Sequence, residues 1–359
     1  MLLGVGLRTD DPAMEIWTTG TALPKVGVRL AERAEADGFD GYLVTDSQNL
    51  AGDPYVTLAL AAKATERLKL GTGVTNPYTR HPAVTASSIA HVQAESGGRA
   101  VLGIGRGDSS LAHLGLGPAP VPAFERYLAR LQGYLRGEEV ELDSPEAGGV
   151  PAASTPTSSR LHWLRPSQPK VPVDVAASGP KVIAAAARHA ERITFAVGAA
   201  PQRLRWAMGV ASAEAAGPVS FGAYVNVVCH PDSAAALALA SGAVTSFARF
   251  SVMHGTPTGP VTDEQRQVME RIPQLYDMTH HFQSQGAQTE AMTAAFADSY
   301  AVLGPADHCI SLLLELEALG LERVVVIGPA FDADRADAAS AHARFVADVL
   351  PAVSARRGG

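Results

Sequence analysis

The amino-acid sequence predicts a single α/β domain, over residues 1–359, folded as a closed (β/α)8 barrel. Eight short apolar runs recur along the chain, and longer segments with helical spacing separate most of them. This alternation is typical of successive βα units around a parallel sheet. The number of runs then favours a closed barrel, because doubly wound open sheets more often stop at about five to seven strands.

The eight apolar runs are the expected strands. In chain order they cover residues 2–7, 41–45, 68–74, 100–104, 171–176, 192–196, 219–228 and 323–327. Helix signals stand between them. A helix over 25–37 ends at Gly38, where a left-handed backbone can close it. Asp53-Pro54 supplies an N-cap and a first-turn proline for the next helix, and Ser178-Gly179-Pro180 opens the fifth in the same way.

Two stretches break this rhythm and are expected to be insertions. Residues 137–170 follow strand four, are rich in Gly, Pro, Ser and Ala, and contain an extended pair around 139–142 and 160–164. Residues 246–300 lie between strands seven and eight and include a helical patch over 263–276. Long insertions in a barrel usually decorate one end and commonly form lids or subunit contacts.

The composition excludes several classes of function. Hydrophobic residues make up 47% of the chain and charged residues 18%, and the formal net charge of −7 does not suit a protein that must neutralise nucleic-acid phosphates. Cys229 and Cys309 lack metal-ligand spacing, so we expect buried thiols and no metal site. No signal peptide and no window of about 18 apolar residues are seen. We therefore expect a cytoplasmic protein that binds neither nucleic acid nor membrane.

Chemistry in a barrel is expected at the carboxyl ends of the strands and in the loops that follow them. The run Gly71-Thr72-Gly73-Val74-Thr75-Asn76-Pro77 ends strand three with small residues, against which a broad flat ring could lie closely. The alternative is a tight barrel corner. The run Gly103-Ile104-Gly105-Arg106-Gly107-Asp108 superficially matches a dinucleotide fingerprint, but no helix begins directly after it, which argues against that interpretation.

Polar groups at two other strand ends leave alternatives open. Ser178-Gly179-Pro180-Lys181 either presents backbone N–H groups to an anion such as a cofactor phosphate or is a plain helix cap. Arg106 and Asp108 flank a glycine, and they either contact the substrate or pair with each other.

Four passages give the chain a resemblance to a known family. They are ADGFDGYLVTDSQN (36–49), LKLGTGVTNPYTRHPAVTASSIA (68–90), GGRAVLGIGRGDSSLAHLG (97–115) and VPVDVAASGPKVIAAAARHAERI (171–193). Over about residues 1–345 the sequence resembles the bacterial luciferase-like family, and it is most similar to the F420-dependent methylene-tetrahydromethanopterin reductase group. The resemblance implies a barrel that carries a redox cofactor at its carboxyl-terminal mouth, either the deazaflavin F420 or FMN.

The resemblance also implies a set of site residues. A non-prolyl cis peptide would end strand three at Gly73-Val74, behind the cofactor ring. The implied cofactor-binding residues are Asp46, Gly73, Val74, Thr75, Asn76, Gly105, Arg106 and Gly107 around the ring and its side chain, and Ala177, Ser178, Gly179, Val197 and Gly198 at the phosphate end. Hydride exchange between reduced F420 and a small organic substrate would need a proton carrier, for which Asp46 and Asp108 are the candidate catalytic residues, since burial favours the neutral form of a carboxyl group.

The chain departs from the reductases at two positions. Gly6 stands where strand one of the reductases has an acidic residue, and Ser47 stands where they have a histidine after the strand-two aspartate. Methanopterin is therefore not carried over as the substrate. These departures also keep a non-catalytic luciferase-like subunit open as an alternative function.

A third candidate is an FMN-dependent monooxygenase that receives reduced flavin from a partner reductase. The two cofactors differ in length, because F420 has a polyglutamate tail that needs an open, cation-lined exit whereas FMN ends at its phosphate. The nearby cations are Arg80, Arg106 and Lys181. A flavin or F420 reductase is a further expected partner, and a homodimer is expected because family relatives commonly dimerise through barrel helices.

Overall fold

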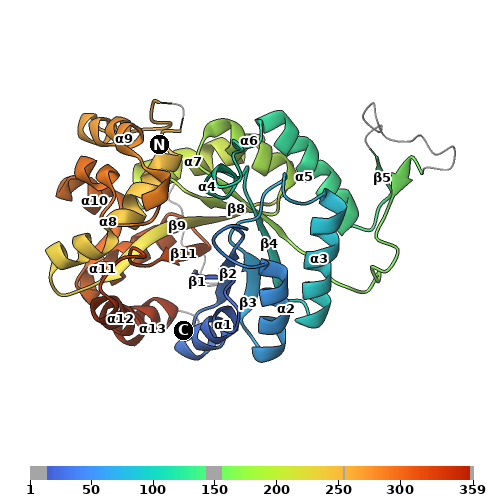
Figure 1. Cartoon of the computed structure of the whole chain (residues 1–359), viewed down its shortest axis with the longest axis horizontal. Coiled ribbons are helices and arrows are strands. Elements are labelled where there is room, and N and C mark those ends of the chain that lie inside the picture. The colour runs from blue at the N-terminus through green and yellow to red at the C-terminus, as the bar shows by residue number, and fades with distance from the viewer. Residues whose placement is uncertain (1–13, 143–155, 254, 356–359) are drawn as a thin grey trace, which may run out of the picture.

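Eight parallel strands close into a ring in the computed structural model, which describes residues 14–142, 156–253 and 255–355. The strands are β1 (Glu15–Thr21), β2 (Gly41–Thr45), β3 (Lys69–Thr72), β4 (Ala100–Ile104), β7 (Val173–Ala177), β8 (Arg192–Phe195), β9 (Ser220–Cys229) and β11 (Arg323–Ile327). They neighbour one another in this order, and the pairing of β11 with β1 closes the ring. Figure 1 shows the ring surrounded by helices. The predicted (β/α)8 barrel is confirmed.

Seven of the eight predicted strands coincide with barrel strands to within a few residues, and the first prediction is wrong. Residues 2–7 lie outside the described residues, and the ring already closes through β1. In β1, Ile16 packs toward the helices while Trp17 packs among residues of the barrel interior. Alternation then turns Glu15 inward as well, so a polar side chain interrupts the apolar run. This interruption explains why the sequence pattern missed the strand.

Helices cover the outside of the ring and begin and end where the chain supplies suitable residues. They are α1 (Val26–Asp37), α2 (Pro54–Ala64), α3 (Pro82–Glu95), α4 (Ser109–Ala112), α5 (Val121–Leu135), α6 (Pro180–His189), α7 (Pro201–Glu214), α8 (Ser233–Phe250), α11 (Ala306–Ala318), α12 (Arg335–Arg344) and α13 (Leu350–Ser354), with a π-helical turn η3 (Phe345–Val349) before the last. Gly38 ends α1 with a φ of 94°. The Asp53 side chain caps α2 by accepting from the backbone N–H of Tyr55 at 2.8 Å.

The first predicted insertion leaves the barrel after α5. It contains the short antiparallel pair β5 (Val140–Glu141) and β6 (Ser158–Ser159), while residues 143–155 lie outside the described residues. In Figure 1 this segment lies beyond α5 and α3 at one side of the molecule.

The second insertion begins later than predicted, because Ser246 to Phe250 still belong to α8. It consists of α9 (Asp263–Leu275), the 3-10 turns η1 (Met278–His280) and η2 (Ala287–Ala291), and α10 (Ala294–Tyr300). The additional strand β10 (Val302–Gly304) follows it and pairs in parallel with the end of β9. Figure 1 shows α9 and α10 on the side of the molecule opposite β5.

The hydrophobic core has two parts. One lies between the ring and the helices and includes Val173 and Leu128, and the other fills the barrel interior with residues such as Leu43. The interior part continues into α8, where the rings of Phe247 and Tyr224 lie 5.8 Å apart. This packing fixes the end of α8 and the second insertion against the inside of the barrel.

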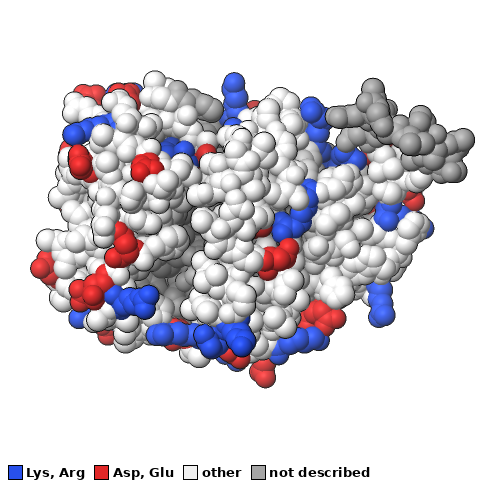
Figure 2. All heavy atoms as spheres, viewed as in Figure 1, with Lys and Arg blue, Asp and Glu red and all other residues white. Residues whose placement is uncertain are grey.

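Two features bear on the sequence prediction that the protein binds neither membrane nor nucleic acid. In contrast to the sequence expectation, the helix α8 is long and apolar enough, by length and composition alone, to cross a membrane. However, 56% of this 18-residue helix is buried inside the protein. On the face shown in Figure 2, basic and acidic side chains are mixed and lie mostly near the edges, and uncharged surface covers much of the centre.

Candidate active site

A glycine-lined wall forms where β3 and β4 end at the barrel mouth. The Gly73–Val74 peptide bond is cis, as the resemblance implied. A Cβ atom at Gly103 would lie 2.0 Å from the Thr72 carbonyl oxygen, so no other residue fits there. The Val74 side chain covers the neighbouring glycine, since a Cβ at Gly105 would lie 3.2 Å from Val74 Cγ2. Backbone hydrogen bonds hold Thr75 beside this wall, with its carbonyl accepting from the Gly105 N–H at 2.9 Å.

Asp46 lies buried behind this wall with both carboxylate oxygens engaged. Its Oδ2 accepts from Thr75 Oγ1 at 2.6 Å and from Arg80 Nη1 at 2.6 Å, and its Oδ1 accepts from Gln48 Nε2. A second contact, from Arg80 Nη2 to Asp53 at 2.9 Å, fixes the guanidinium. Burial acts to lower the pKa of Arg80, but the two carboxylates leave it above its usual value. The arrangement favours a positioning role for Asp46 rather than the proton transfer that was predicted.

Several buried donors near the mouth have no partner among the residues that the structure describes, and two of them belong to residues predicted to bind the cofactor. Asn76 is fully buried, and its Oδ1 accepts from the backbone N–H groups of Tyr78 and Thr79 at 3.0 Å each, while its Nδ2 is unpaired. Arg106 Nε is likewise buried and unpaired. Burial lowers the pKa of Arg106, although Asp108 acts in the opposite direction. Buried polar atoms without partners are uncommon in native proteins, and each one needs an explanation such as an absent ligand.

Asp108 pairs with a residue far along the chain. The sequence left open a pair between Asp108 and Arg106, but the salt bridge joins Asp108 to Arg249, at the end of α8. Asp108 lies in the loop after β4, and α8 is the helix that follows β9, so the bridge joins segments that leave the barrel at two different strands. Burial raises the pKa of Asp108, while Arg249 and then Arg106 act to lower it. Asp108 is thus the carboxyl group at the mouth whose surroundings favour proton binding.

An aromatic and imidazole group surrounds Arg249. The Arg249 guanidinium lies 4.7 Å from the centre of the Tyr276 ring. The Tyr276 hydroxyl donates to Ser246 Oγ at 3.0 Å and contacts His281 Nδ1. Burial, reinforced by Arg249 and His113, lowers the pKa of His281 to about 3, so this imidazole is neutral at physiological pH. Sequence reasoning missed Arg249, Tyr276 and His281, because they lie on and after α8 and no local motif marks them.

The residues predicted for the phosphate end lie together at the ends of β7 and β8, where the Ala196 N–H donates to the Ala177 carbonyl at 2.8 Å. The Ser178 hydroxyl donates to the Phe250 carbonyl at 2.8 Å, and therefore ties β7 to α8 instead of capping α6. The N-cap of α6 is Gly179, which makes no side-chain bond. The Val197 carbonyl accepts from Arg203 Nε at 3.0 Å. Any anion here would have to be held by backbone N–H groups.

Gly198 has a φ of +82°, and a Cβ there would lie 2.6 Å from the Tyr300 ring, so this position requires glycine. Gly107 is constrained in the same way, with a φ of +74° and a Cβ that would lie 2.9 Å from Asn76 Cβ. Both glycines therefore allow close packing at the mouth. In the part of the chain that the structure describes, no three His, Cys, Asp or Glu side chains gather as a metal site would require.

The structure supports only one of the two departures from the reductases, at Gly6 and Ser47, that the sequence suggested. Gly6 lies outside the described residues, and it was compared with strand one on a wrong strand assignment, because strand one of the barrel is β1. Ser47 is buried directly after Asp46, and its carbonyl accepts from the N–H groups of Leu50 and Ala51. Only the departure at Ser47 therefore remains.

The buried donors of the mouth suit a ligand with several hydrogen-bond acceptors. Three buried nitrogens there have no partner among the described residues: Asn76 Nδ2, Arg106 Nε and Asn226 Nδ2. An isoalloxazine-type ring with a phosphate chain supplies such acceptors. The residues present are therefore compatible with the cofactors that the resemblance implied.

Comparison with known proteins decides the family. A family model described as luciferase-like monooxygenase matches residues 14–323. The chain belongs to this family.

Relatives of this luciferase-like protein include two curated enzymes. The chain is 35% identical to 5,10-methylenetetrahydromethanopterin reductase of Methanolobus tindarius over 190 residues, which are 52% of this chain and 51% of that protein. It is 34% identical to F420-dependent glucose-6-phosphate dehydrogenase of Intrasporangium calvum over 165 residues, which are 44% of this chain and 49% of that protein. The chain thus spans about half the length of these relatives.

A solved structure extends the likeness to the whole barrel. The structure of the coenzyme F420 dependent tetrahydromethanopterin reductase of Methanopyrus kandleri superposes with a TM-score of 0.70, covering 94% of this chain and 99% of that one. At 23% sequence identity, this likeness shows a shared fold.

Proposed function

We propose that this protein is an oxidoreductase that binds the deazaflavin F420 at the barrel mouth and exchanges a hydride with a small organic substrate, which is still to be identified. The observation that carries the proposal is the glycine wall with the unpaired buried donors Asn76 Nδ2 and Arg106 Nε beside it. The F420-dependent relatives among the similar proteins support the choice of cofactor.

Different residues of the mouth would have different roles in such a site. When bound, a deazaflavin supplies two-electron hydride chemistry. The Val74 side chain, which covers Gly105, would back the ring, and Asn76 and Arg106 would donate to the ring or to its side chain. We assign proton exchange to the Asp108 carboxyl, because burial raises its pKa, and we assign Asp46 the task of holding Thr75 in place.

A paired titration tests this proposal. The protein, freed of cofactor, is titrated with F420 and separately with FMN, and binding is followed by fluorescence. We expect tight F420 binding and weak FMN binding, after which hydride donors and acceptors are screened for turnover. The reverse preference would contradict the proposal.

The second candidate is an FMN-dependent monooxygenase that works with a partner reductase. The observation in its favour is that the matching family model is described by monooxygenase activity. The buried donors of the mouth do not distinguish the rings of the two cofactors, so this candidate would be adopted if FMN bound more tightly than F420. The hypothesis of a non-catalytic subunit was based on the departures at Gly6 and Ser47, and only the one at Ser47 remains. This hypothesis would be adopted only if neither cofactor bound.

We further propose a homodimer, located in the cytoplasm, with a flavin or F420 reductase as its redox partner. Light scattering after size exclusion tests the first point. A single species at the 37.3 kDa mass of one chain would contradict it.

A further inference from the structure

Asn226 is a buried polar residue of β9 to which the proposed function gives no role. Along this strand Val225 and Val227 pack toward the helices, whereas Tyr224 and Val228 pack among residues of the barrel interior. Side chains alternate along a strand, so Asn226 also points into the interior.

The carboxamide of Asn226 lacks a partner. The residue is only 2% exposed, and its Nδ2 makes no hydrogen bond with any described residue. Asn226 pairs with Ile327, the last residue of β11, and so lies at the carboxyl end of that strand. Because a buried donor without a partner disfavours folding, this one indicates a ligand with a hydrogen-bond acceptor.

Asn226 faces the glycine wall from the opposite side of the barrel. Three strands separate β9 from β3 in either direction: β11, β1 and β2 on one side, and β8, β7 and β4 on the other. In the proposed function, Val74 at the end of β3 backs one face of the cofactor ring. The other face of that ring is then turned toward β9, and a substrate that exchanges a hydride with it must lie on this side.

Aromatic side chains continue from β9 toward the surface. We call Tyr224, Phe247, Phe250, Phe282 and Phe331 the ring group. The ring centres lie 5.8 Å apart for Tyr224 and Phe247, 5.5 Å for Phe247 and Phe250, 5.8 Å for Phe247 and Phe282, and 5.1 Å for Phe282 and Phe331. The group begins at buried Tyr224 and ends at Phe331, which is 70% exposed in the loop after β11. Such rings suit stacking against a flat apolar ligand.

The exposed end of the ring group is held by a left-handed backbone at Phe282. Its φ is 63°, a conformation that a bulky residue keeps only where its surroundings impose it. The Phe282 N–H donates to Ser246 Oγ at 3.0 Å, and its carbonyl accepts from the Phe331 N–H at 2.9 Å. The second insertion and the loop after β11 thus fix these rings together.

The groups beside these rings favour an uncharged ligand. The Arg249 guanidinium lies 5.7 Å from the centre of the Phe250 ring, but its charge is paired with Asp108. His281 lies 4.9 Å from the Phe282 ring, and burial lowers its pKa to about 3, so it is neutral at physiological pH. Neither group offers a free charge to an anion.

We propose that Asn226 and the ring group bind the substrate, and that this substrate is an uncharged aromatic ketone or aldehyde, or the corresponding alcohol. The inference rests on the proposed function, which places the cofactor ring at the opposite wall. Asn226 Nδ2 donates to the carbonyl oxygen, and the ring group packs against the aromatic part. In the reduction, the carbonyl carbon gains the hydride of the reduced deazaflavin and the oxygen gains a proton from Asp108, which yields the alcohol and the oxidised deazaflavin. The oxidation reverses these transfers.

The test measures the binding of three fluorinated probes by fluorine NMR, with and without F420. The first, para-fluoroacetophenone, has both the aromatic ring and the carbonyl, whereas para-fluoroethylbenzene lacks the carbonyl and fluorocyclohexanone lacks the aromatic ring. We expect wild type to bind the acetophenone about tenfold more tightly than either of the others, through one hydrogen bond in the first comparison and ring stacking in the second.

Asn226→Leu tests the hydrogen bond. It should abolish the preference for the acetophenone over the ethylbenzene, and its urea midpoint should not fall, because the donor that it removes has no partner in the folded chain. Gln93→Leu is the matched control, since Gln93 is an equally buried amide whose Nε2 donates to Pro169 and whose Oε1 accepts from Ala100. This control should lower the midpoint and leave the binding of all three probes unchanged.

Phe331→Ala tests the ring group. We expect it to weaken binding of both aromatic probes about threefold and to leave fluorocyclohexanone unchanged. Trp163→Ala, which removes an exposed ring of the first insertion, should change none of the three affinities. Equal losses in the two variants would overturn the assignment of the ring group.

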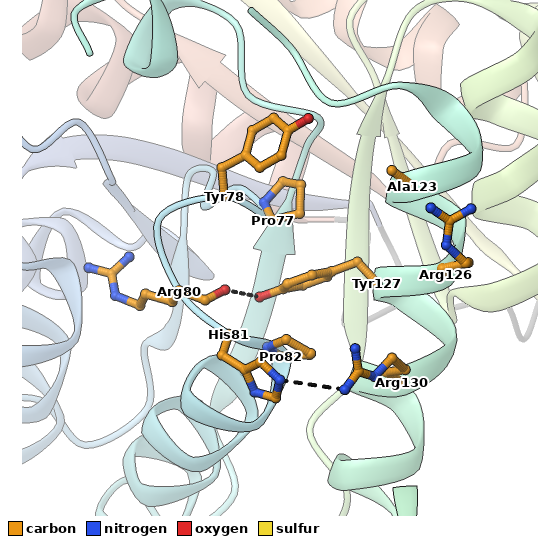
Figure 3. A pocket seen from close by; sticks show the side chains of 9 residues that line it. All are labelled: Pro77, Tyr78, Arg80, His81, Pro82, Ala123, Arg126, Tyr127 and Arg130. Carbon is orange, nitrogen blue, oxygen red and sulfur yellow. Dashed lines mark hydrogen bonds between the residues drawn. The ribbon is translucent and has the colours of Figure 1, made fainter. Parts of the chain in front are cut away.

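Binding in another cavity is tested separately. Figure 3 shows a pocket of about 330 Å³ between the loop that follows β3 and α5, with Ala123 and Tyr127 in its lining. Ala123→Leu narrows this pocket and should leave the three affinities unchanged. A loss of binding in Ala123→Leu, with none in Asn226→Leu, would overturn the proposal and place the probes in this pocket.

The remaining outcomes separate the two proposals. Equal binding of the acetophenone and the ethylbenzene by wild type, or a preference that persists in Asn226→Leu, would overturn the role of Asn226. Fluorocyclohexanone binding as tightly as the acetophenone would overturn the aromatic substrate class. A loss of F420 affinity in Asn226→Leu would also overturn the proposal, because it would assign the amide to the cofactor. Failure of wild type to bind F420 while it still preferred the ketone would instead overturn the proposed function alone.

Discussion

The two ends of the barrel interior are both polar, but they are built differently. At the amino-terminal end, Arg323 is fully buried, and its Nη2 lies 3.1 Å from Asp174 Oδ2 and donates to Thr194 Oγ1 at 3.0 Å. Thr194 donates in turn to Asp174 at 2.8 Å. Arg192 lies 3.6 Å from the same carboxylate, so both arginines have an ion-pair partner within the protein, although Arg192 Nε and Nη2 and Arg323 Nε make no hydrogen bond among the described residues.

Glu15 completes the charged network at this amino-terminal end of the barrel, which we call the closed end. It forms a salt bridge with Lys69 and accepts from Trp17 Nε1 at 2.8 Å. Burial acts to raise the pKa of Glu15, but Lys69, Trp17 and Arg192 leave it below its usual value. Gly222 leaves room for the network, because a Cβ there would lie 2.8 Å from Arg323 Nε.

The strand β4 shows the same contrast over its own length. Arg99, just before the strand, donates to the carbonyls of Leu68 and Ala62 at 2.6 and 2.9 Å and to that of Thr65 at 2.8 Å. Arg106, two residues past the strand, has a buried Nε with no described partner. A polar group satisfied by its own chain stabilises the fold, whereas a partly buried cation such as Arg106, which has neither a hydrogen bond at Nε nor an ion pair among the described residues, needs another partner, such as a bound ligand.

The largest expected effect is at the closed end. Asp174→Ala removes the carboxylate shared by Arg323 and Arg192, and leaving buried charge uncompensated costs about 3–5 kcal/mol. Urea unfolding at pH 7 measures the loss, and F420 affinity of the folded variant should stay within about twofold of wild type. Glu95→Ala, which removes an exposed partner of Lys63, should leave the unfolding midpoint nearly unchanged. A similar midpoint for both variants would break the comparison.

The next effect separates the two arginines of β4. Arg106→Met keeps the apolar stem and loses the donor, so we expect F420 to bind about tenfold more weakly and the free energy of unfolding to fall by less than about 1 kcal/mol. Arg99→Met should show the opposite pattern, with a clear loss of stability and unchanged F420 affinity. The reason is that the substitution leaves several carbonyl acceptors without a donor. Fluorescence titration and urea unfolding of both variants provide the check. Loss of affinity in Arg99→Met alone would reverse our assignment of the two ends.

The same contrast explains what the sequence could and could not predict. Strands such as β2 and β4 are buried on both faces and read as apolar runs, so their positions and the residues after them, including Asp46 and Asp108, were found. In β1 the inward residues join the closed-end network, and the run is broken by Glu15. Contacts between distant segments leave no periodic signal. For this reason Arg249 and its contacts with Asp108 and Tyr276 became visible only in the folded chain.

The smallest expected effect is a pH dependence at the mouth. Folded His281 has a pKa of about 3, against an ordinary value near 6.5, so between these values the unfolded chain binds a proton that the folded protein does not. Stability should therefore fall as the pH drops below about 6.5, with a limiting slope of about 1.4 kcal/mol per pH unit from this group. His281→Asn removes the contribution, so its stability relative to wild type should rise by about 1 kcal/mol between pH 7.5 and pH 5.5. Urea midpoints at the two pH values measure this change, and His162→Asn, at an exposed histidine of the first insertion, serves as the matched control. Parallel pH profiles for wild type and His281→Asn would show that the imidazole is solvated, and that the cluster around Arg249 is more open than the packing of Tyr276 indicates.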